Sequence, residues 1–323
     1  DPIFDSQIDV YAGAISLLDE GISALNSANT GSVAEDIYFG GDKAKWIAAA
    51  YTLKARFYLH QKNYASAFTA AQNGISSANG DMKYNPPGAA GSGDRNLFWT
   101  ILEGSRSGDI GNSDQGESYL IQMLDPANAL SRNNAKTDET ARKGFYTIDS
   151  SGGSANTGIL EMTQPQNMVT YFENQLILAE CAARNGTLTD GLPYLNAVRA
   201  WMNTGGHVNS NFQSEPYSYL AYDAADFASG GIENTDGVDS KTAFLREVIE
   251  ERYVSGFGMH MPYNDSRRLR KSDSGIAVPY ILFDGPQNGP WPERMPYATT
   301  ELNSNSNAPA EDPGIFVVTR VNQ

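Results

Sequence analysis

The stretch Asp36–His60, DIYFGGDKAKWIAAAYTLKARFYLH, decides the fold of this 323-residue chain. The amphipathic run Lys62–Ala78 follows it directly, so the sequence predicts a loop, a helix, a tight turn and a second helix. Small and aromatic residues recur through both helices: Trp46, Tyr51, Ala55, Tyr58, Tyr64, Ala67 and Ala71. Small side chains on one helix let aromatic rings of the other approach, so we expect a closely packed antiparallel pair.

Helical spacing of apolar residues returns in five further segments. They are Ser6–Asn26, Ser118–Leu124, Gln166–Asn185, Asp190–Asn203 and Lys241–Gly256. Between them, the tracts Gly80–Gly116 and Ala127–Pro165 are rich in turn-forming residues, and so is the chain beyond Gly258. We expect these tracts to be irregular, with a few short strands in the second.

The helix pairs share a loose tetratricopeptide-like period, which is clearest at Ala55, Tyr58, Tyr64 and Ala67. The sequence therefore predicts a mainly α fold in a single domain over residues 1–323. Tetratricopeptide-like helix pairs would form a scaffold that carries long irregular loop insertions. Functional side chains are then expected on the loops, which a rigid scaffold holds in place.

Composition limits the classes of ligand. The formal net charge is −15, which argues against nucleic acid, because phosphates require a basic protein face. The same charge disfavours adhesion to anionic membranes and leaves neutral ligands, such as sugars or peptides. No run approaches the roughly 20 apolar residues of a membrane span. The single cysteine, Cys181, lies on a helical pattern and is expected to be a small buried residue.

Three segments resemble the SusD/RagB family. The first is the opening stretch, through Gly40, Gly41, Asp42, Lys45, Trp46, Leu53 and Arg56. The second is a helix followed by an arginine pair, in EVIEERYVSGFGMHMPYNDSRRL (247–269). The third is PERMPYATTELNSNSN (292–307), through Pro292, Arg294, Pro296, Tyr297, Glu301 and Asn305. Their order along the chain is also that of the family.

This resemblance implies a mostly helical, lipid-anchored outer-membrane protein at the cell surface of Bacteroidetes. Such a protein captures oligosaccharides, or in some members peptides, and passes them to a SusC-like TonB-dependent transporter without catalysis. From the resemblance we expect that an N-terminal part of the family and the lipid anchor are not included in this chain.

Candidate ligand-binding residues follow from what sugars require: flat aromatic faces rimmed by hydrogen-bonding groups. The tract Gly80–Gly116 and the helix after it supply both, in Arg95, Asn96, Phe98, Trp99, Asp109 and Tyr119. Tyr217 and Tyr219 form a second candidate platform, and Trp291 a possible rim contact. For Phe98 and Trp99 the alternative is that they only plug their loop onto the scaffold. Trp46 is expected in the core.

Other chemistries have weaker signals. Asp109–Glu117 and Asn234–Asp239 carry oxygen ligands that could hold a structural calcium ion, but we favour solvated turns, and we expect no cofactor. Arg267 and Arg268 could clamp an acidic sugar or, as we favour, anchor loops. No hydrolase motif is present. An all-α glycoside hydrolase or lyase, and a helical-repeat scaffold that binds protein or peptide, remain the alternatives to a capture protein.

Overall fold

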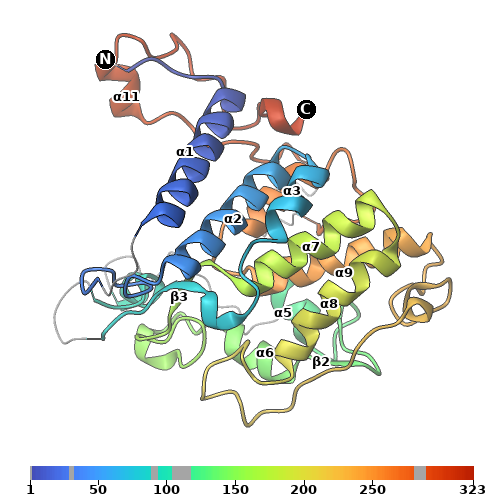
Figure 1. Ribbon diagram of the computed structural model, residues 1–323. Helices are drawn as coiled ribbons and strands as arrows, with labels where there is room; N and C mark the ends of the chain where they lie inside the picture. The colour runs from blue at the N-terminus through green and yellow to red at the C-terminus, as the bar shows by residue number, and fades with distance from the viewer. Residues whose placement is uncertain (1, 29–32, 89–93, 104–117, 280–288) are drawn as a thin grey trace.

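The computed structural model describes residues 2–28, 33–88, 94–103, 118–279 and 289–323 (Figure 1). Its helices are α1 (Gln7–Ser27), α2 (Lys43–His60), α3 (Tyr64–Ala71), α4 (Leu97–Glu103), α5 (Tyr119–Leu124), α6 (Thr140–Tyr146), α7 (Tyr171–Asn185), α8 (Leu188–Met202), α9 (Ser240–Ser255), α10 (Met261–Leu269) and α11 (Thr299–Ser304). Its strands are β1 (Met82–Tyr84), β2 (Thr137–Asp138), β3 (Gln166–Val169) and β4 (Ser218–Tyr219). The expected mainly α fold is confirmed.

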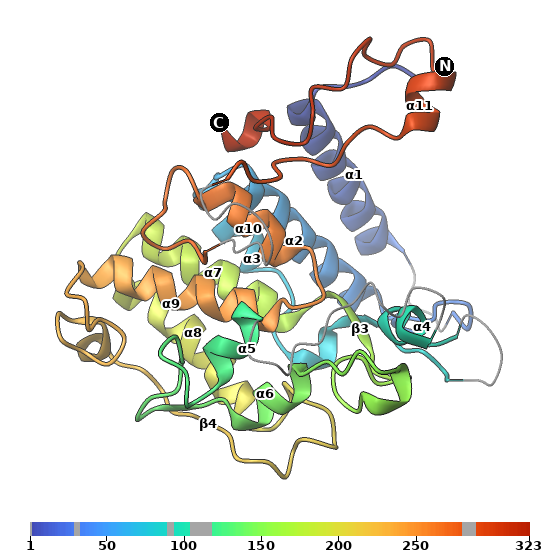
Figure 2. The same cartoon turned by 180° about the vertical axis from the view of Figure 1, so that it is seen from behind.

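The helices α2, α3, α7, α8 and α9 stack side by side and form the scaffold (Figures 1 and 2). Helix α1 packs against α2 at one edge of this stack, and the two chain ends and α11 gather beyond it. The helices α5 and α6 lie on the other side, with two small antiparallel ladders, β1–β3 and β2–β4. The structure thus contains the helix pairs with inserted loops that the repeat spacing predicted.

The first predicted pair, α2 and α3, packs as its small residues require. Ala55, Ala67 and Ala71 are buried in one cluster, against which the rings of Tyr58 and Tyr64 pack. Asp42 and Asn63 cap the two helices by accepting hydrogen bonds from backbone N–H groups in their first turns. Cys181 of α7 lies in the same cluster and is fully buried, as expected, and burial raises the pKa of its thiol to about 12.

The second pair, α7 and α8, needs a glycine where the helices approach most closely. A Cβ atom added at Gly191 would lie 2.5 Å from the carbonyl oxygen of Ala179 on α7 and 2.7 Å from the Phe244 ring on α9. Both distances are far below van der Waals contact, so any side chain at this position must push the helices apart.

This contact gives a prediction on stability. Gly191→Ala is expected to lower the free energy of unfolding by about 1–3 kcal/mol, because the added methyl overpacks three helices. The matched control is Gly21→Ala on α1, where the added Cβ meets no atom within 4 Å. That variant should gain up to about 1 kcal/mol from helix propensity alone. Urea unfolding of both variants measures the opposite signs, and equal effects would contradict the packing argument.

The structure differs from expectation in the irregular tracts. Helix α4 lies inside Gly80–Gly116, α6 inside Ala127–Pro165, and both α10 and α11 beyond Gly258, so these four helices were missed. Conversely, the predicted helix start at Gln166 is wrong, because residues 166–169 form β3 and the helix begins at Tyr171. Strand β3 exists because β1, more than 80 residues earlier, pairs with it. Local spacing carries no record of such a partner.

Candidate ligand-binding site

A cavity of about 520 Å³ opens where α2, α4, the β1–β3 ladder and the start of α10 meet, and we call it the Phe98 pocket. Its lining combines tyrosine, phenylalanine and amide residues with aliphatic ones and comprises Tyr38, Arg56, Tyr84, Asn96, Leu97, Phe98, Ile159, Pro165, Gln166, Asn167, Met168, Phe257, Gly258, Met259, His260, Met261 and Asn264. Its size lies within the usual range for small-molecule sites.

Helix α4, which was not predicted from the sequence, contributes to the wall of the Phe98 pocket. Asn96 begins α4, because its side-chain oxygen accepts hydrogen bonds from the N–H groups of Phe98 (2.9 Å) and Trp99. Its amide N–H₂ donates to the carbonyls of Gln164 (2.9 Å) and Ile159, which ties α4 to the segment before β3. Phe98 is half-buried and packs near the backbone of Gly258, where a Cβ would approach its ring to 3.3 Å.

One wall of the pocket comes from the loop that begins at Asp36 and leads into α2. Asp36 accepts hydrogen bonds from the backbone N–H of Tyr38 (3.1 Å) and Gly41 (2.8 Å), and from the indole N–H of Trp46 (2.7 Å). The Trp46 hydrogen bond is the main reason that the pKa of Asp36 falls to about 2. The Asp36 carboxylate therefore holds the loop in place through these hydrogen bonds, and this keeps Tyr38 at the pocket. Trp46 itself is half-buried beneath the loop.

Another wall is the β1–β3 ladder. Tyr84 pairs with Gln166 across the two strands, and Lys83 pairs with Asn167. Tyr84, Gln166 and Asn167 line the cavity, so residues that are about 80 positions apart in sequence form one surface. None of the three was singled out from the sequence, and neither were Tyr38, Phe257 and Asn264. Tyr38, Phe257 and Asn264 lay in stretches that the family resemblance had marked.

The pocket has a neutral electrostatic character. Arg56 is the one permanently charged side chain among its described lining residues, and Glu173 takes up that charge through a two-point ion pair, with Nη2 2.6 Å from Oε2. The same Nη2 donates to the carbonyl of Met168 (2.8 Å). Arg56 thus serves as a fixed wall, and polar groups are offered to the cavity by the amides of Gln166, Asn167 and Asn264 and the hydroxyls of Tyr38 and Tyr84.

The other residues predicted from the same tract lie elsewhere. Trp99 faces away from the pocket, with the Arg95 guanidinium 4.6 Å from its ring centroid and the backbone of Gly153 against its edge. Asp109, and the possible calcium segment Asp109–Glu117, lie outside the described residues. Tyr119 lines a different cavity, between α5, α9 and α10. The structure therefore brings only Phe98 and Asn96 of this group to the Phe98 pocket.

The second predicted platform is part of the protein interior. Tyr219 is 1% exposed, and its hydroxyl donates to Glu139 (2.9 Å), so it offers no face to a ligand. Tyr217 packs against the main core cluster with the His207 ring at its edge, 5.3 Å between centroids. Burial lowers the pKa of His207 to about 4. Trp291 is half-buried beside Gly289, away from the Phe98 pocket.

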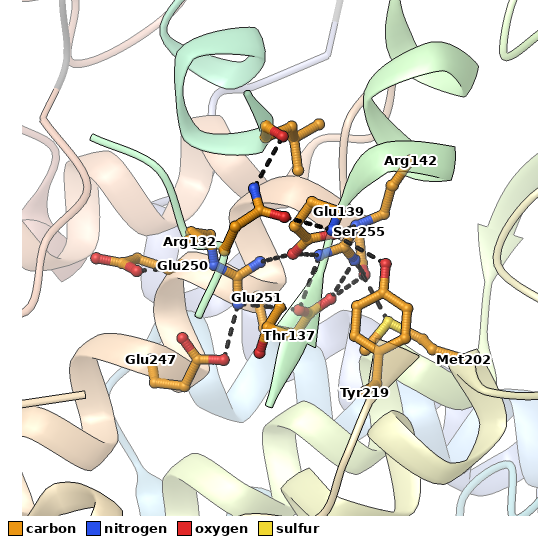
Figure 3. A network of polar contacts seen from close by, with 12 residues as sticks. Arg132, Thr137, Glu139, Arg142, Met202, Tyr219, Glu247, Glu250, Glu251 and Ser255 are labelled. Carbon is orange, nitrogen blue, oxygen red and sulfur yellow. Dashed lines mark hydrogen bonds and ion pairs between the residues drawn. The ribbon is translucent and has the colours of Figure 1, made fainter. Parts of the chain in front are cut away.

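Tyr219 belongs to a buried ion network that joins four segments (Figure 3). Arg142 bonds to Glu139 (2.7 Å) and to Glu251 (2.7 Å), and Arg132 bonds to Glu251 (3.0 Å) and Glu247 (2.8 Å). All five side chains are almost fully buried. Such a network replaces an apolar core here and fixes the long loop between α5 and α6 to α9.

A second buried network explains the arginine pair. Arg268 bonds to Glu180 (2.7 Å) and Asp265 (2.8 Å), while Arg267 donates to the carbonyl of Glu293 (2.8 Å). Arg267 therefore anchors the segment of Glu293, as we favoured, whereas Arg268 joins helix α10 to helix α7. In the other possible calcium segment, Asp236 pairs with Arg246. Within the described ranges, no group of three or more His, Cys, Asp or Glu residues is arranged to hold a metal ion.

Comparison with known proteins decides the family. A family profile described as "SusD-like", starch-binding and associating with the outer membrane, matches residues 1–262. The chain belongs to this family. It is a SusD-like nutrient-binding protein that associates with the outer membrane, and proteins of this family bind without catalysis. No helix among the described residues is long and apolar enough to cross a bilayer.

Solved structures show the same fold. A SusD/RagB family protein from Bacteroides thetaiotaomicron is 22% identical with a TM-score of 0.61, over 95% of this chain and 70% of that one. A chitin-binding SusD homologue from Flavobacterium johnsoniae is 18% identical with a TM-score of 0.59, over 94% and 68%. A SusD homologue from Parabacteroides distasonis is 18% identical with a TM-score of 0.56, over 94% and 70%. No curated protein sequence matches this chain.

Proposed function

We propose that this protein captures a neutral oligosaccharide in the Phe98 pocket at the cell surface and delivers it to a partner SusC-like TonB-dependent transporter. The observation that carries the proposal is the pocket's lining: aromatic rings together with amides, and one arginine whose charge Glu173 already neutralises. Aromatic faces suit the C–H face of a pyranose, and amides suit its hydroxyls, while an acidic sugar would find no free cation among the described lining residues.

The amides also favour a sugar class. Gln166 and Asn167 can pair with the acetamido group of an N-acetylated sugar, since an amide both donates and accepts, and the amide N–H₂ of Asn264 can donate to it. Two of the similar structures are described as chitin-binding proteins. Oligomers of N-acetylglucosamine are therefore the first ligands to test, followed by neutral glucans.

We further propose that residues 1–323 act as one unit. The C-terminal segment returns to the start of the chain, where Asn305 donates to the carbonyl of Pro2 (2.9 Å) and the N–H of Val321 donates to Gln7 (3.2 Å). It also contacts the pocket-forming helix α10, because Arg267 and Arg270 bond to Glu293. The segment would stabilise the position of α10 beside the ligand.

The test is the binding of N-acetylglucosamine oligomers and neutral glucans to Phe98→Ala, measured by isothermal titration calorimetry. Loss of one stacking ring should weaken binding by about 1 kcal/mol or more, a five- to tenfold rise in Kd. The control is Phe316→Ala, because Phe316 is a 51% exposed phenylalanine that does not line the pocket. Saccharide binding that Phe98→Ala leaves unchanged would contradict the proposed site, and binding of peptides alone would contradict the ligand class.

A further inference from the structure

A second cavity, of about 320 Å³, lies between α5, α9 and α10, and we call it the tyrosine pocket. Its walls are three tyrosine rings and two prolines: Tyr119, Tyr253, Tyr263, Pro262 and Pro279. Helix α10 separates it from the Phe98 pocket. Met261 and Asn264 line the first cavity, whereas Tyr263 and Ser266 line the second, as expected for residues on different faces of one helix.

The three tyrosine hydroxyls of this pocket are the unusual feature. Among the residues that the structure describes, none of the three hydroxyls has a hydrogen-bond partner. The rings of Tyr119 and Tyr253 meet edge to face, with centroids 6.1 Å apart, so they form a corner and not a flat stack. All three tyrosines are only half-buried, so these unpaired hydroxyls are free to bind a ligand.

The protonation state of these groups is settled by burial. Burial raises the pKa of Tyr253 to about 12 and also raises the pKa of Tyr119, so both are neutral hydrogen-bond donors at physiological pH. The one carboxylate of the pocket, Asp265, is engaged by Arg268 (2.8 Å) and Arg252. The Arg267 guanidinium lies 4.5 Å from the ring centroid of Tyr263 and covers one face of that ring. No unpaired charge of the described lining faces the cavity.

We propose that the tyrosine pocket is a second saccharide-binding site, distinct from the Phe98 pocket, that takes a neutral pyranose unit. The aromatic corner provides apolar contact for the C–H face of the ring, and the phenol hydroxyls hydrogen-bond to the sugar hydroxyls. The absence of unpaired charge among the described lining residues disfavours anionic and cationic ligands. The choice of a saccharide rests on the proposed function, whereas the location does not. A protein with both sites would hold a polysaccharide at two points.

Calorimetry with tri-N-acetylglucosamine, or with the neutral trisaccharide that binds best, measures the number of sites. The parent protein is expected to bind two molecules. Phe98→Ala should weaken one site, and the double variant Tyr253→Phe, Tyr263→Ala should weaken the other about fivefold or more. Tyr194→Phe is the matched control, because Tyr194 packs half-buried on the scaffold outside both pockets. Thermal unfolding verifies that each variant is folded.

The outcomes separate this inference from the proposed function. A single site that Phe98→Ala weakens and the double variant leaves unchanged would overturn the second site and support the first. A single site with the opposite pattern would support the tyrosine pocket and overturn the Phe98 pocket. A single site that both variants weaken would mean that one ligand spans the two cavities, and it would overturn the claim of separate sites. No binding of any saccharide would overturn both.

Discussion

Glu251→Gln is expected to lower the free energy of unfolding by about 3–5 kcal/mol, the largest effect that we predict for a single substitution. One oxygen of Glu251 accepts from Arg142 (2.7 Å) and Ser255 (2.5 Å), and the other accepts from Arg132 (3.0 Å). The side chain is 1% exposed. Glutamine keeps the shape but leaves the two buried guanidinium groups short of one negative charge, which water cannot replace.

The direction of the Glu251 pKa supports this expectation. Burial alone would raise the pKa, but Arg142 and Arg132 lower it further than burial raises it, so the pKa lies below the usual range. The control is Asp236→Asn, which alters another two-point pair with arginine, Arg246. Asp236 is 51% exposed, so water screens the pair and the stability should hardly change. Equal losses in the two variants, by chemical denaturation, would contradict a special role for the buried network.

The second large effect is a pH dependence at Glu247. Burial raises the pKa of Glu247 to about 7, although Arg132 lies 2.8 Å away and opposes the shift. A carboxyl group whose pKa is raised in the folded state stabilises the fold below its unfolded pKa of 4.5, and the stabilisation is lost as pH rises through 7. The nearby carboxyl groups of Glu233 and Glu251 add to the effect of burial on this pKa, and Arg132 is shared with Glu251.

The measurement compares Glu247→Gln with the parent protein from about pH 5.5 to pH 8.5. Relative to the parent, the variant should gain about 2 kcal/mol of unfolding free energy over this range, because only the parent must ionise a buried carboxyl group. Taking the difference removes the contributions of His60 and His207, whose pKa values burial lowers to about 3 and about 4. A difference that stays flat with pH would show that Glu247 is ionised throughout.

Helices with an apolar stripe were predictable, and the reason is visible in the pairs α2–α3 and α7–α8. Ala55, Ala67 and Leu178 occupy buried positions, so sequence spacing and structural burial coincide. In the helices that were missed, apolar spacing and structural burial do not coincide. In α6 a buried position is held by Arg142, and in α10 by Asp265 and Arg268, so ionisable residues in the interior looked like solvent-facing ones.

The candidate site was predictable only in part, for a related reason. Phe98 and Asn96 were found because they lie in a loop-rich tract with aromatic and amide residues, but Trp99 next to them faces Arg95 and Gly153. Adjacent residues on one helix point in directions about 100° apart, so naming a tract does not decide which ring reaches the ligand. Tyr84 and Gln166 become neighbours only through strand pairing.

By itself, the sequence determined the fold class, the first helix pair and the family resemblance, because these depend on short-range spacing and motifs that each segment carries alone. Tertiary structure decided which aromatic rings line a cavity and which arginines are neutralised in the interior. Cavities and buried ion pairs arise from side chains that are brought together from distant segments, such as Arg132 with Glu247 or Arg56 with Glu173. Their energies depend on burial and distance, which only the folded chain defines.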